Sequence, residues 1–161
     1  MKEKIADFLS NKYLLLALRL GVGFVFIIAS IGKIIDPVKF MDKVYEYALL
    51  PDMFVPAFSY ILPWIEFFTG LMLMLNIYAQ SAAFICCGTL VAFITAIFVQ
   101  ISRGVSMDCG CFDFLIPDEQ IGYTTIARDF SMLLVASVIL VFDENKAKIY
   151  GLYDKVKKLL K

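Results

Sequence analysis

The 161-residue chain contains no histidine, and only 19% of its residues are charged. Without an imidazole it cannot carry a Ser-His-Asp triad, a histidine-ligated zinc or haem, or a histidine proton shuttle. A soluble domain normally has about a quarter of its residues charged, so this scarcity predicts a membrane protein. Fifteen Lys and Arg residues balance fifteen Asp and Glu residues, which leaves no net positive field to attract nucleic acid.

Apolar residues make up 61% of the chain and gather in four long segments. The segments are residues 13–31, 55–75, 79–101 and 121–142. A membrane-spanning helix needs about 20 mostly apolar residues, and a helix satisfies its own backbone polar groups in lipid. We therefore predict an all-α membrane protein, a single domain over residues 1–161 built on a four-transmembrane-helix bundle. Because proline kinks a helix interior, a start of the second helix nearer Pro63 is an alternative.

Two linking segments have the pattern of surface helices. Asp36-Pro37 is typical of an N-cap followed by a first-turn proline, which predicts a short interfacial helix after the first span. Its predicted polar face is formed by Lys39, Asp42, Lys43 and Glu46 and its apolar face by Phe40, Met41, Val44 and Tyr47. The tail, residues 144–161, is basic and amphipathic, so we expect it to lie on the anionic lipids of the inner leaflet.

The distribution of positive residues predicts the orientation. The ends of the spans that would face the cytoplasm are flanked by Lys2, Lys4, Lys12, Lys146, Lys148, Lys155, Lys157, Lys158 and Lys161. The opposite ends are flanked by Lys33, Lys39, Lys43 and Arg103. The positive-inside rule then places both termini in the cytoplasm of an inner-membrane protein and the loop over residues 102–120 outside.

The four spans contain only four charged residues, which are Arg19, Glu66, Arg128 and Asp129. A charge at membrane depth costs about 2.5 to 3.5 kcal/mol on insertion scales, so each should face the bundle interior and find a partner. Arg19 and Glu66 could lie at similar depths on neighbouring antiparallel helices, which predicts an Arg19–Glu66 pair.

The half of the bundle that is predicted to lie outside contains Arg128, Asp129, Lys33 and Arg103. Arg128 and Asp129 are adjacent, so they project about 100° apart on a helix and are expected to contact different neighbours. Asp129, Lys33 and Arg103 are candidates for an outer polar cluster. These charges either lock the helices in register or line a path for substrate or protons.

The most informative motif is Cys109-Gly110-Cys111. It lies in the loop predicted to be outside the membrane, where disulfides form and persist. A bond between these sulfurs requires a bent backbone, which glycine permits, and a strained disulfide suits exchange better than scaffolding. A static bridge or two separate thiols are the alternatives.

Cys86 and Cys87 are adjacent within the third span. Free cysteine is a common small apolar residue in helix packing, and packing is the role that we expect here. At 1.5 Å per residue Cys87 would lie about 20 Å from the outer end of its helix, too far to exchange directly with Cys109. A four-cysteine zinc site is disfavoured for the same reason, so no metal is predicted.

These residues together resemble the MauE branch of the DoxX-like integral membrane proteins. The matching positions are Arg19, Gly23, Phe26, Ser30, Lys33, Pro63-Trp64-Ile65-Glu66, Gly70, Cys109-Gly110-Cys111-Phe112 and Arg128-Asp129. The resemblance covers the chain up to about Phe142. It implies a four-helix membrane accessory that helps form disulfides in a periplasmic client together with a thioredoxin-like partner, in methylamine utilisation. DoxX relatives imply a link to quinones.

The leading hypothesis is a thiol-disulfide oxidoreductase. Cys109 and Cys111 would exchange with a periplasmic thioredoxin-fold protein, and a quinone held near Trp64 and Phe112 would carry the electrons. One alternative is a non-catalytic assembly factor that docks a periplasmic client. The other is a small proton-coupled transporter that uses Glu66.

Overall fold

The computed structural model describes residues 12–104 and 122–142. These ranges form five helices: α2 (Lys12–Ile35), α3 (Pro37–Tyr47), α4 (Val55–Leu75), α5 (Ala79–Ser102) and α6 (Tyr123–Phe142). All except α3 are long and apolar enough to cross a membrane. The predicted all-α architecture with four membrane-spanning helices is therefore confirmed. The Cys109 loop and the basic tail lie outside the described residues.

The ends of the spans lie within two residues of the prediction, except at the end of the first span. The alternative start of the second span near Pro63 is wrong, because α4 begins at Val55 and continues through Pro63. Pro56 falls in the first turn of α4, where a missing backbone N–H leaves no hydrogen bond unmade. The first span runs on to Ile35 rather than ending at Ile31, because Lys33 has an ion-pair partner inside the bundle.

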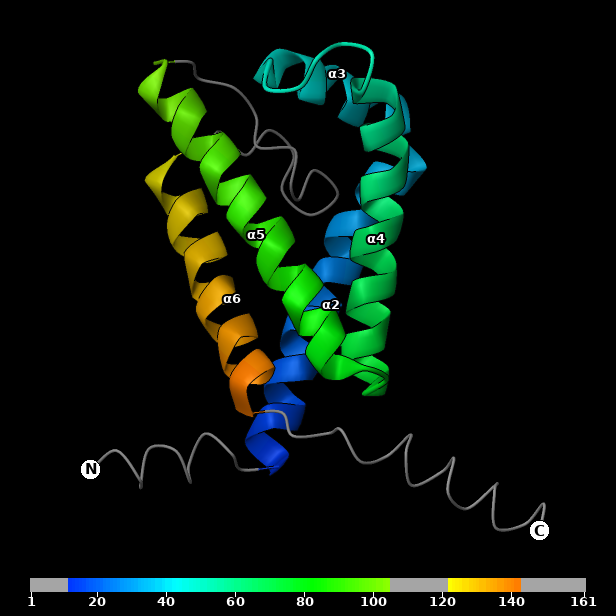
Figure 1. The fold of residues 1–161 in the computed structure, drawn as a ribbon, viewed down its shortest axis with the longest axis vertical. Helices are drawn as coiled ribbons and strands as arrows, with labels where there is room; N and C mark the ends of the chain where they lie inside the picture. The colour runs from blue at the N-terminus through cyan, green and yellow to red at the C-terminus, as the bar shows by residue number, and fades with distance from the viewer. Residues whose placement is uncertain (1–11, 105–121, 143–161) are drawn as a thin grey trace, which may run out of the picture.

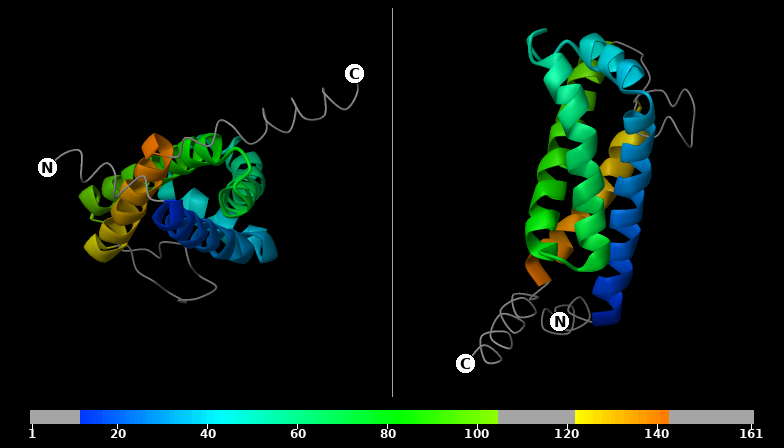
Figure 2. Two further views of the ribbon diagram at one scale, coloured as in Figure 1. Left: turned by 90° about the horizontal axis from the view of Figure 1, so that it is seen from below. Right: turned by 90° about the vertical axis from the view of Figure 1, so that its right-hand side faces the viewer.

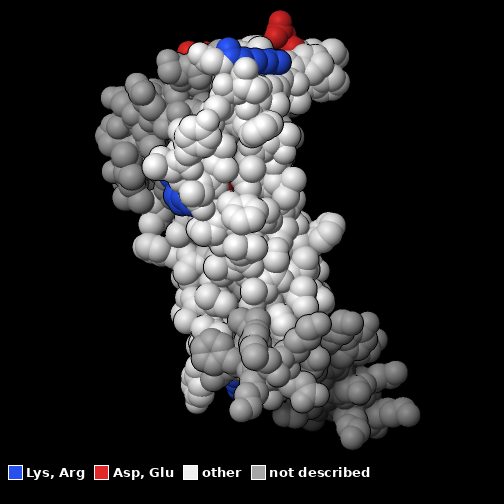
Figure 3. All heavy atoms as spheres, turned by 90° about the vertical axis from the view of Figure 1, so that its left-hand side faces the viewer, with Lys and Arg blue, Asp and Glu red and all other residues white. Residues whose placement is uncertain are grey.

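The bundle alternates in direction (Figures 1 and 2). α2 and α5 run toward the end that carries α3, and α4 and α6 run away from it. We call the end with α3 the α3 end; the start of α2 and the end of α6 lie at the opposite end. Figure 3 shows one face, on which charged side chains gather over the α3 end while most of the surface between the ends is uncharged. This uncharged surface is what lipid contact requires.

α2 and α4 cross with their backbones in close approach at Gly23 and Gly70. A Cβ atom built on Gly23 would lie 2.7 Å from the Gly70 carbonyl oxygen, and one built on Gly70 would lie 2.7 Å from the Gly23 carbonyl oxygen. Glycine is thus required on both sides, as at many membrane helix interfaces where packing replaces the hydrophobic effect. This contact fixes the register of α2 against α4.

The short helix α3 begins as predicted. The Asp36 side chain accepts a hydrogen bond of 3.0 Å from the Lys39 backbone N–H. At its other end, the Tyr47 carbonyl oxygen accepts hydrogen bonds from the side chains of Gln100 and, at 3.3 Å, Arg103. α5 therefore supplies the donors that hold the C-terminal end of α3, a position where helix carbonyls lack partners of their own.

Replacing Asp36 with alanine should loosen α3 locally. Loss of an N-cap costs about 1 kcal/mol, so amide hydrogen exchange in α3 should become about fivefold faster while exchange in α4 is unchanged. Asp42→Ala is the matched control, because Asp42 is exposed on the same helix. Equal exchange rates in the two variants would show that the cap does not stabilise α3.

The interior of the bundle changes character along its length. Toward the opposite end it is an apolar cluster that includes Val22, Leu73, Ala82, Cys86, Ala136 and Ile139. Toward the α3 end a second apolar cluster, formed by Phe40, Val44, Val55 and Leu62, is joined by a set of buried polar side chains: Ser30, Lys33, Lys43, Ser59, Gln100, Thr125 and Asp129. Glu66 lies between the two regions on α4.

Candidate functional site

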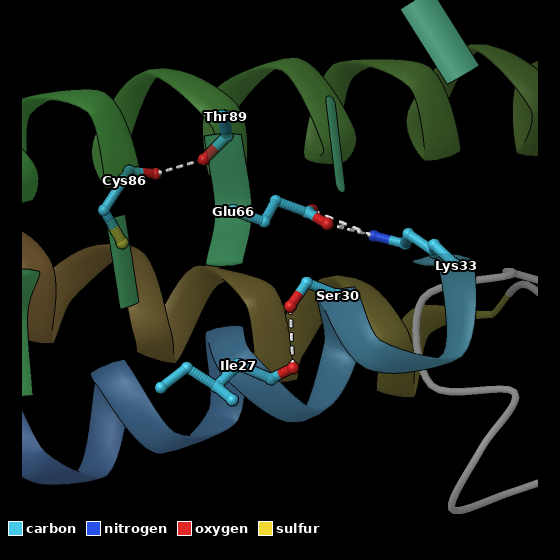
Figure 4. A network of polar contacts seen from close by, with 6 residues as sticks. All are labelled: Ile27, Ser30, Lys33, Glu66, Cys86 and Thr89. Carbon is cyan, nitrogen blue, oxygen red and sulfur yellow. Dashed lines mark hydrogen bonds and ion pairs between the residues drawn. The ribbon is translucent and has the colours of Figure 1, made fainter. Parts of the chain in front are cut away.

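The centre of the polar region is a buried ion pair between Lys33 of α2 and Glu66 of α4. The Lys33 Nζ atom lies 2.9 Å from Glu66 Oε1 and 2.8 Å from Oε2, and both residues are at most 5% exposed. Figure 4 shows the two side chains extended toward each other between their helices. A bidentate pair of this kind offsets the cost of placing either charge at membrane depth.

The predicted Arg19–Glu66 pair is wrong, because the two residues lie at different depths. The contact of Gly23 with Gly70 puts Glu66 level with about Ile27 on the antiparallel helix α2. Arg19 then lies about 12 Å further toward the opposite end, at 1.5 Å per residue.

The direction of helical side chains explains why Lys33 is the partner instead. Side chains lean toward the N-terminus of their own helix. Lys33 therefore leans from the α3 end down toward the middle of the bundle, and Glu66 on the antiparallel helix leans up. The two side chains converge, whereas that of Arg19 leans away.

Arg19 holds the turn between α4 and α5. Its Nη1 atom donates a hydrogen bond to the Asn76 side-chain oxygen, and its Nε donates to the Leu15 carbonyl at 3.3 Å. Asn76 is the left-handed residue that ends α4. Arg19 thus has a structural contact at the opposite end of the bundle, away from the other predicted site residues.

Asp129 of α6 joins the polar region from the other side. It is 3% exposed and lines a cavity of about 30 Å³ together with Lys33 and Glu66. Six of the nine residues that line this cavity are apolar, and the other three are Lys33, Glu66 and Asp129. The predicted proximity of Asp129 and Lys33 is therefore confirmed, and the cavity places one ammonium and two carboxylate groups around a common space.

Two details of the predicted outer cluster are wrong. Arg128 and Asp129 contact each other, with Arg128 Nε 3.1 Å from Asp129 Oδ1, because the long arginine side chain bends back across the angle between neighbouring positions. Arg103 lies exposed at the end of α5 and binds the Tyr47 carbonyl. It is not among the residues that line the cavity between Lys33 and Asp129.

Some buried polar residues of this region were not predicted. Ser59 Oγ on α4 and Thr125 Oγ1 on α6 are buried and have no hydrogen-bond partner within the described part of the chain. Their spacing was a usable signal: Ser59 precedes Glu66 by seven residues and Thr125 precedes Asp129 by four. These separations place each hydroxyl on the same helix face as the carboxylate.

A larger cavity of about 380 Å³ lies between α3, α4 and α5 at the α3 end. Its walls are formed by Lys33, Phe40, Lys43, Val44, Tyr47, Leu49, Leu50, Phe58, Leu62, Gly88, Thr89, Ala92, Phe93, Ala96 and Ile97. Lys43 is 9% exposed, so its predicted place on the polar face of α3 is wrong. Its long apolar stem packs beneath the helix.

Of the two residues predicted to bind a quinone ring, only Trp64 lies among the described residues. Trp64 is 49% exposed, and its ring stacks on that of Phe68 with centroids 6.1 Å apart. Trp64 lines neither of the two cavities described above. Phe112, Cys109 and Cys111 lie outside the described residues.

Cys86 and Cys87 are free thiols in α5. Cys86 is fully buried in the apolar cluster, as the packing interpretation predicted, and Cys87 packs against that cluster. The Cys87 sulfur lies 3.9 Å from the Ser137 hydroxyl of α6. Among the described residues, no group of three or more His, Cys, Asp or Glu side chains could hold a metal ion.

Comparison with known proteins gives a consistent result. A family model described as "Methylamine utilisation protein MauE" matches residues 11–142. The chain is 30% identical to the methylamine utilization protein MauE of Paracoccus denitrificans over 109 residues, which are 67% of this chain and 59% of that protein. It is 31% identical to the protein of the same name from Methylophilus methylotrophus over 124 residues, 74% of this chain and 65% of that one.

The relative from Methylorubrum extorquens is 34% identical over 109 residues, covering 67% of this chain and 58% of that protein. The matches thus span about three fifths of the length of the curated relatives. No solved structure matches the chain significantly. The chain therefore belongs to the MauE family of multi-pass membrane proteins.

Proposed function

We propose that this protein is a membrane accessory that matures a client outside the cytoplasm by thiol-disulfide exchange at Cys109 and Cys111. The relatives carry methylamine utilization in their name, and we propose that this chain serves that process. It would act on a periplasmic thioredoxin-fold protein or on the client itself.

One observation carries the proposal. The segment with the Cys-Gly-Cys-Phe motif joins the end of α5 to the start of α6, and both of these lie at the α3 end. The buried charges Lys33, Glu66 and Asp129 gather in the half of the bundle below the same end. The two helix ends that bound this segment and the buried charges therefore lie in the same half of the bundle, which supports a thiol exchange coupled to proton transfer there.

The exchange has two balanced steps. One partner thiolate attacks the Cys109–Cys111 disulfide, which forms a mixed disulfide and releases the other cysteine as a thiolate. The second partner thiolate then displaces the bound cysteine, so the partner leaves as a disulfide and Cys109 and Cys111 remain as thiols. Re-forming their disulfide passes two electrons and two protons to a membrane-dissolved quinone, which leaves as a quinol.

The proposed orientation follows the distribution of lysine and arginine. With the α3 end outside and both termini in the cytoplasm of an inner-membrane protein, Cys109 and Cys111 face an oxidising compartment. The reactive loop could then meet a periplasmic partner without crossing the membrane.

The exchange can be tested by trapping. We expect a thioredoxin-fold protein with serine in place of its second active-site cysteine to accumulate as a mixed disulfide with the wild-type chain. The variant Cys109→Ser/Cys111→Ser should form none, whereas Cys86→Ser/Cys87→Ser, the matched control, should form the wild-type amount. The adducts are measured on non-reducing gels after alkylation. An adduct that survives in the Cys109→Ser/Cys111→Ser variant contradicts the proposal.

A non-catalytic assembly factor is the second candidate, and family membership favours it. In that case the α3 end would hold a client, and the cysteines would only clip the loop. Client maturation that continues in Cys109→Ser/Cys111→Ser at the wild-type rate, together with the absence of any trapped adduct, would support the assembly factor over the exchange mechanism.

A further inference from the structure

The 380 Å³ cavity between α3, α4 and α5 reaches the lipid-facing surface. Gly88 and Ala92 of α5 line it and are exposed, and Phe58 of α4 lines it and is 37% exposed. α4 and α5 diverge from the turn between them toward the α3 end (Figure 1). The volume falls in the range of pockets that hold small molecules, and a molecule dissolved in the bilayer could enter from the side.

Small residues on one face of α5 leave room for the cavity. Gly88, Ala92 and Ala96 recur every four residues and therefore lie on one face of α5. A Cβ atom built on Gly88 would meet nothing within 4 Å. The end of the cavity is covered by Phe40 and Val44, the two buried apolar residues of α3.

The Lys33 ammonium group lies close to one wall of the cavity. It lies 5.2 Å from the ring centre of Phe40 and 4.9 Å from that of Phe93, and both rings also line the cavity. Because Lys33 is paired with Glu66, the pair as a whole is neutral. A neutral head that accepts hydrogen bonds fits beside this wall, whereas a phosphate would have to lose its hydration at membrane depth.

Lys43 of α3 also lines the cavity, whose surface is almost entirely apolar. The cavity therefore combines flat aromatic rings, one nearby ammonium group and a long apolar wall. These are the features that hold a planar ring with carbonyl oxygens and a hydrocarbon tail.

We propose that this cavity is a quinone site, with the ring beside Lys33, Phe40 and Phe93 and the tail leaving between α4 and α5. This site does not include Trp64. A quinone here would be the electron acceptor that the proposed function requires, so the assignment rests on that function, but its binding can be measured without any thiol exchange.

Photolabelling of the full chain in phosphatidylcholine nanodiscs tests the site. The probe is a short-tailed azidobenzoquinone, and unlabelled decylubiquinone and phosphatidylglycerol are the competitors. We expect label on the peptides that contain Phe58 or Phe93, displaced by decylubiquinone. Two variants fill the cavity, Ala92→Trp and Gly88→Leu, and each should reduce the label by about tenfold or more, since the added side chain takes the ligand's space. Circular dichroism verifies that both fold.

Trp64→Leu is the matched control and should label like the wild type. Label on the Trp64 peptide, or full labelling in both cavity variants, overturns the site. Displacement by phosphatidylglycerol but not by decylubiquinone shows a lipid site instead. The measurement is repeated in Cys109→Ser/Cys111→Ser, where labelling should persist. If trapping fails but labelling persists, only the exchange function is lost; if trapping succeeds but labelling fails, only the quinone site is lost.

Discussion

Gly23→Ala and Gly70→Ala should each destabilise the bundle by about 3 kcal/mol, the upper part of the range for overpacking a close contact. The added methyl group would meet the backbone carbonyl of the facing helix at 2.7 Å in both cases. A flexible side chain could move aside, but a carbonyl that is part of a helix cannot. α2 and α4 would have to separate, and the ion pair above the crossing would be stretched. The measurement is the free energy of unfolding in mixed micelles titrated with SDS.

Gly21→Ala is the control that isolates this effect. Gly21 lies on the same helix, and a Cβ atom built there meets nothing within 4 Å. Because alanine is the better helix former by about 1 kcal/mol, this variant should be as stable as the wild type or slightly more stable. If all three variants lose the same stability, backbone contact between α2 and α4 is not the cause.

Removal of one partner of the Lys33–Glu66 pair should be the second large effect. Glu66→Gln or Lys33→Met leaves the remaining side chain without the oppositely charged group that it binds at 2.8 Å. Breaking a buried pair in this way costs about 3 to 5 kcal/mol. The same SDS titration measures the loss.

The double variant Lys33→Met/Glu66→Leu separates structure from function. Replacing both partners with apolar side chains of similar size is often neutral or stabilising, so the double variant should recover most of the stability lost in the single variants. If the pair also serves proton transfer, the double variant should still lose client oxidation. A double variant as unstable as the sum of the two single ones would show that the pair contributes little coupling energy.

The helices could be predicted from the sequence because their causes are local. Length and hydropathy set the spans, and the start of α4 at Val55 matches the prediction. The start of α3 was predictable because the cap depends only on Asp36 and the residues directly after it. The first span was predicted to be too short. A lysine near the end of an apolar segment indicates that the membrane span ends there, unless an ion-pair partner for that lysine inside the bundle is known.

The partner of Glu66 could not be predicted because it depends on how α2 and α4 align. That alignment is set where Gly23 meets Gly70, and a single sequence does not say which glycines face each other. Glycine on two neighbouring spans was nevertheless a signal, since small residues mark membrane helix interfaces. Combining that crossing with the lean of helical side chains would have favoured Lys33 over Arg19.

The larger cavity was missed for a related reason. Its position depends on what is absent, namely large side chains on the face of α5 that carries Gly88 and Ala92. Trp64 was predicted to contact a quinone ring because it is aromatic. The composition of a helix does not show which of its faces points outward. Trp64 stacks with Phe68 on the exposed side of α4.

The two halves of the bundle interior differ in polarity, and this difference has a consequence for charge movement across the membrane potential. Glu66 has buried polar side chains such as Ser59 and Asp129 toward the α3 end. Toward the opposite end it faces the layer of packed hydrocarbon that includes Leu73, Ala82 and Ile139. In the described helices, protons taken up or released in the middle of the bilayer would thus return to the side from which they came. In the thiol exchange proposed above, no charge would cross the full field, so the exchange would neither consume nor generate voltage.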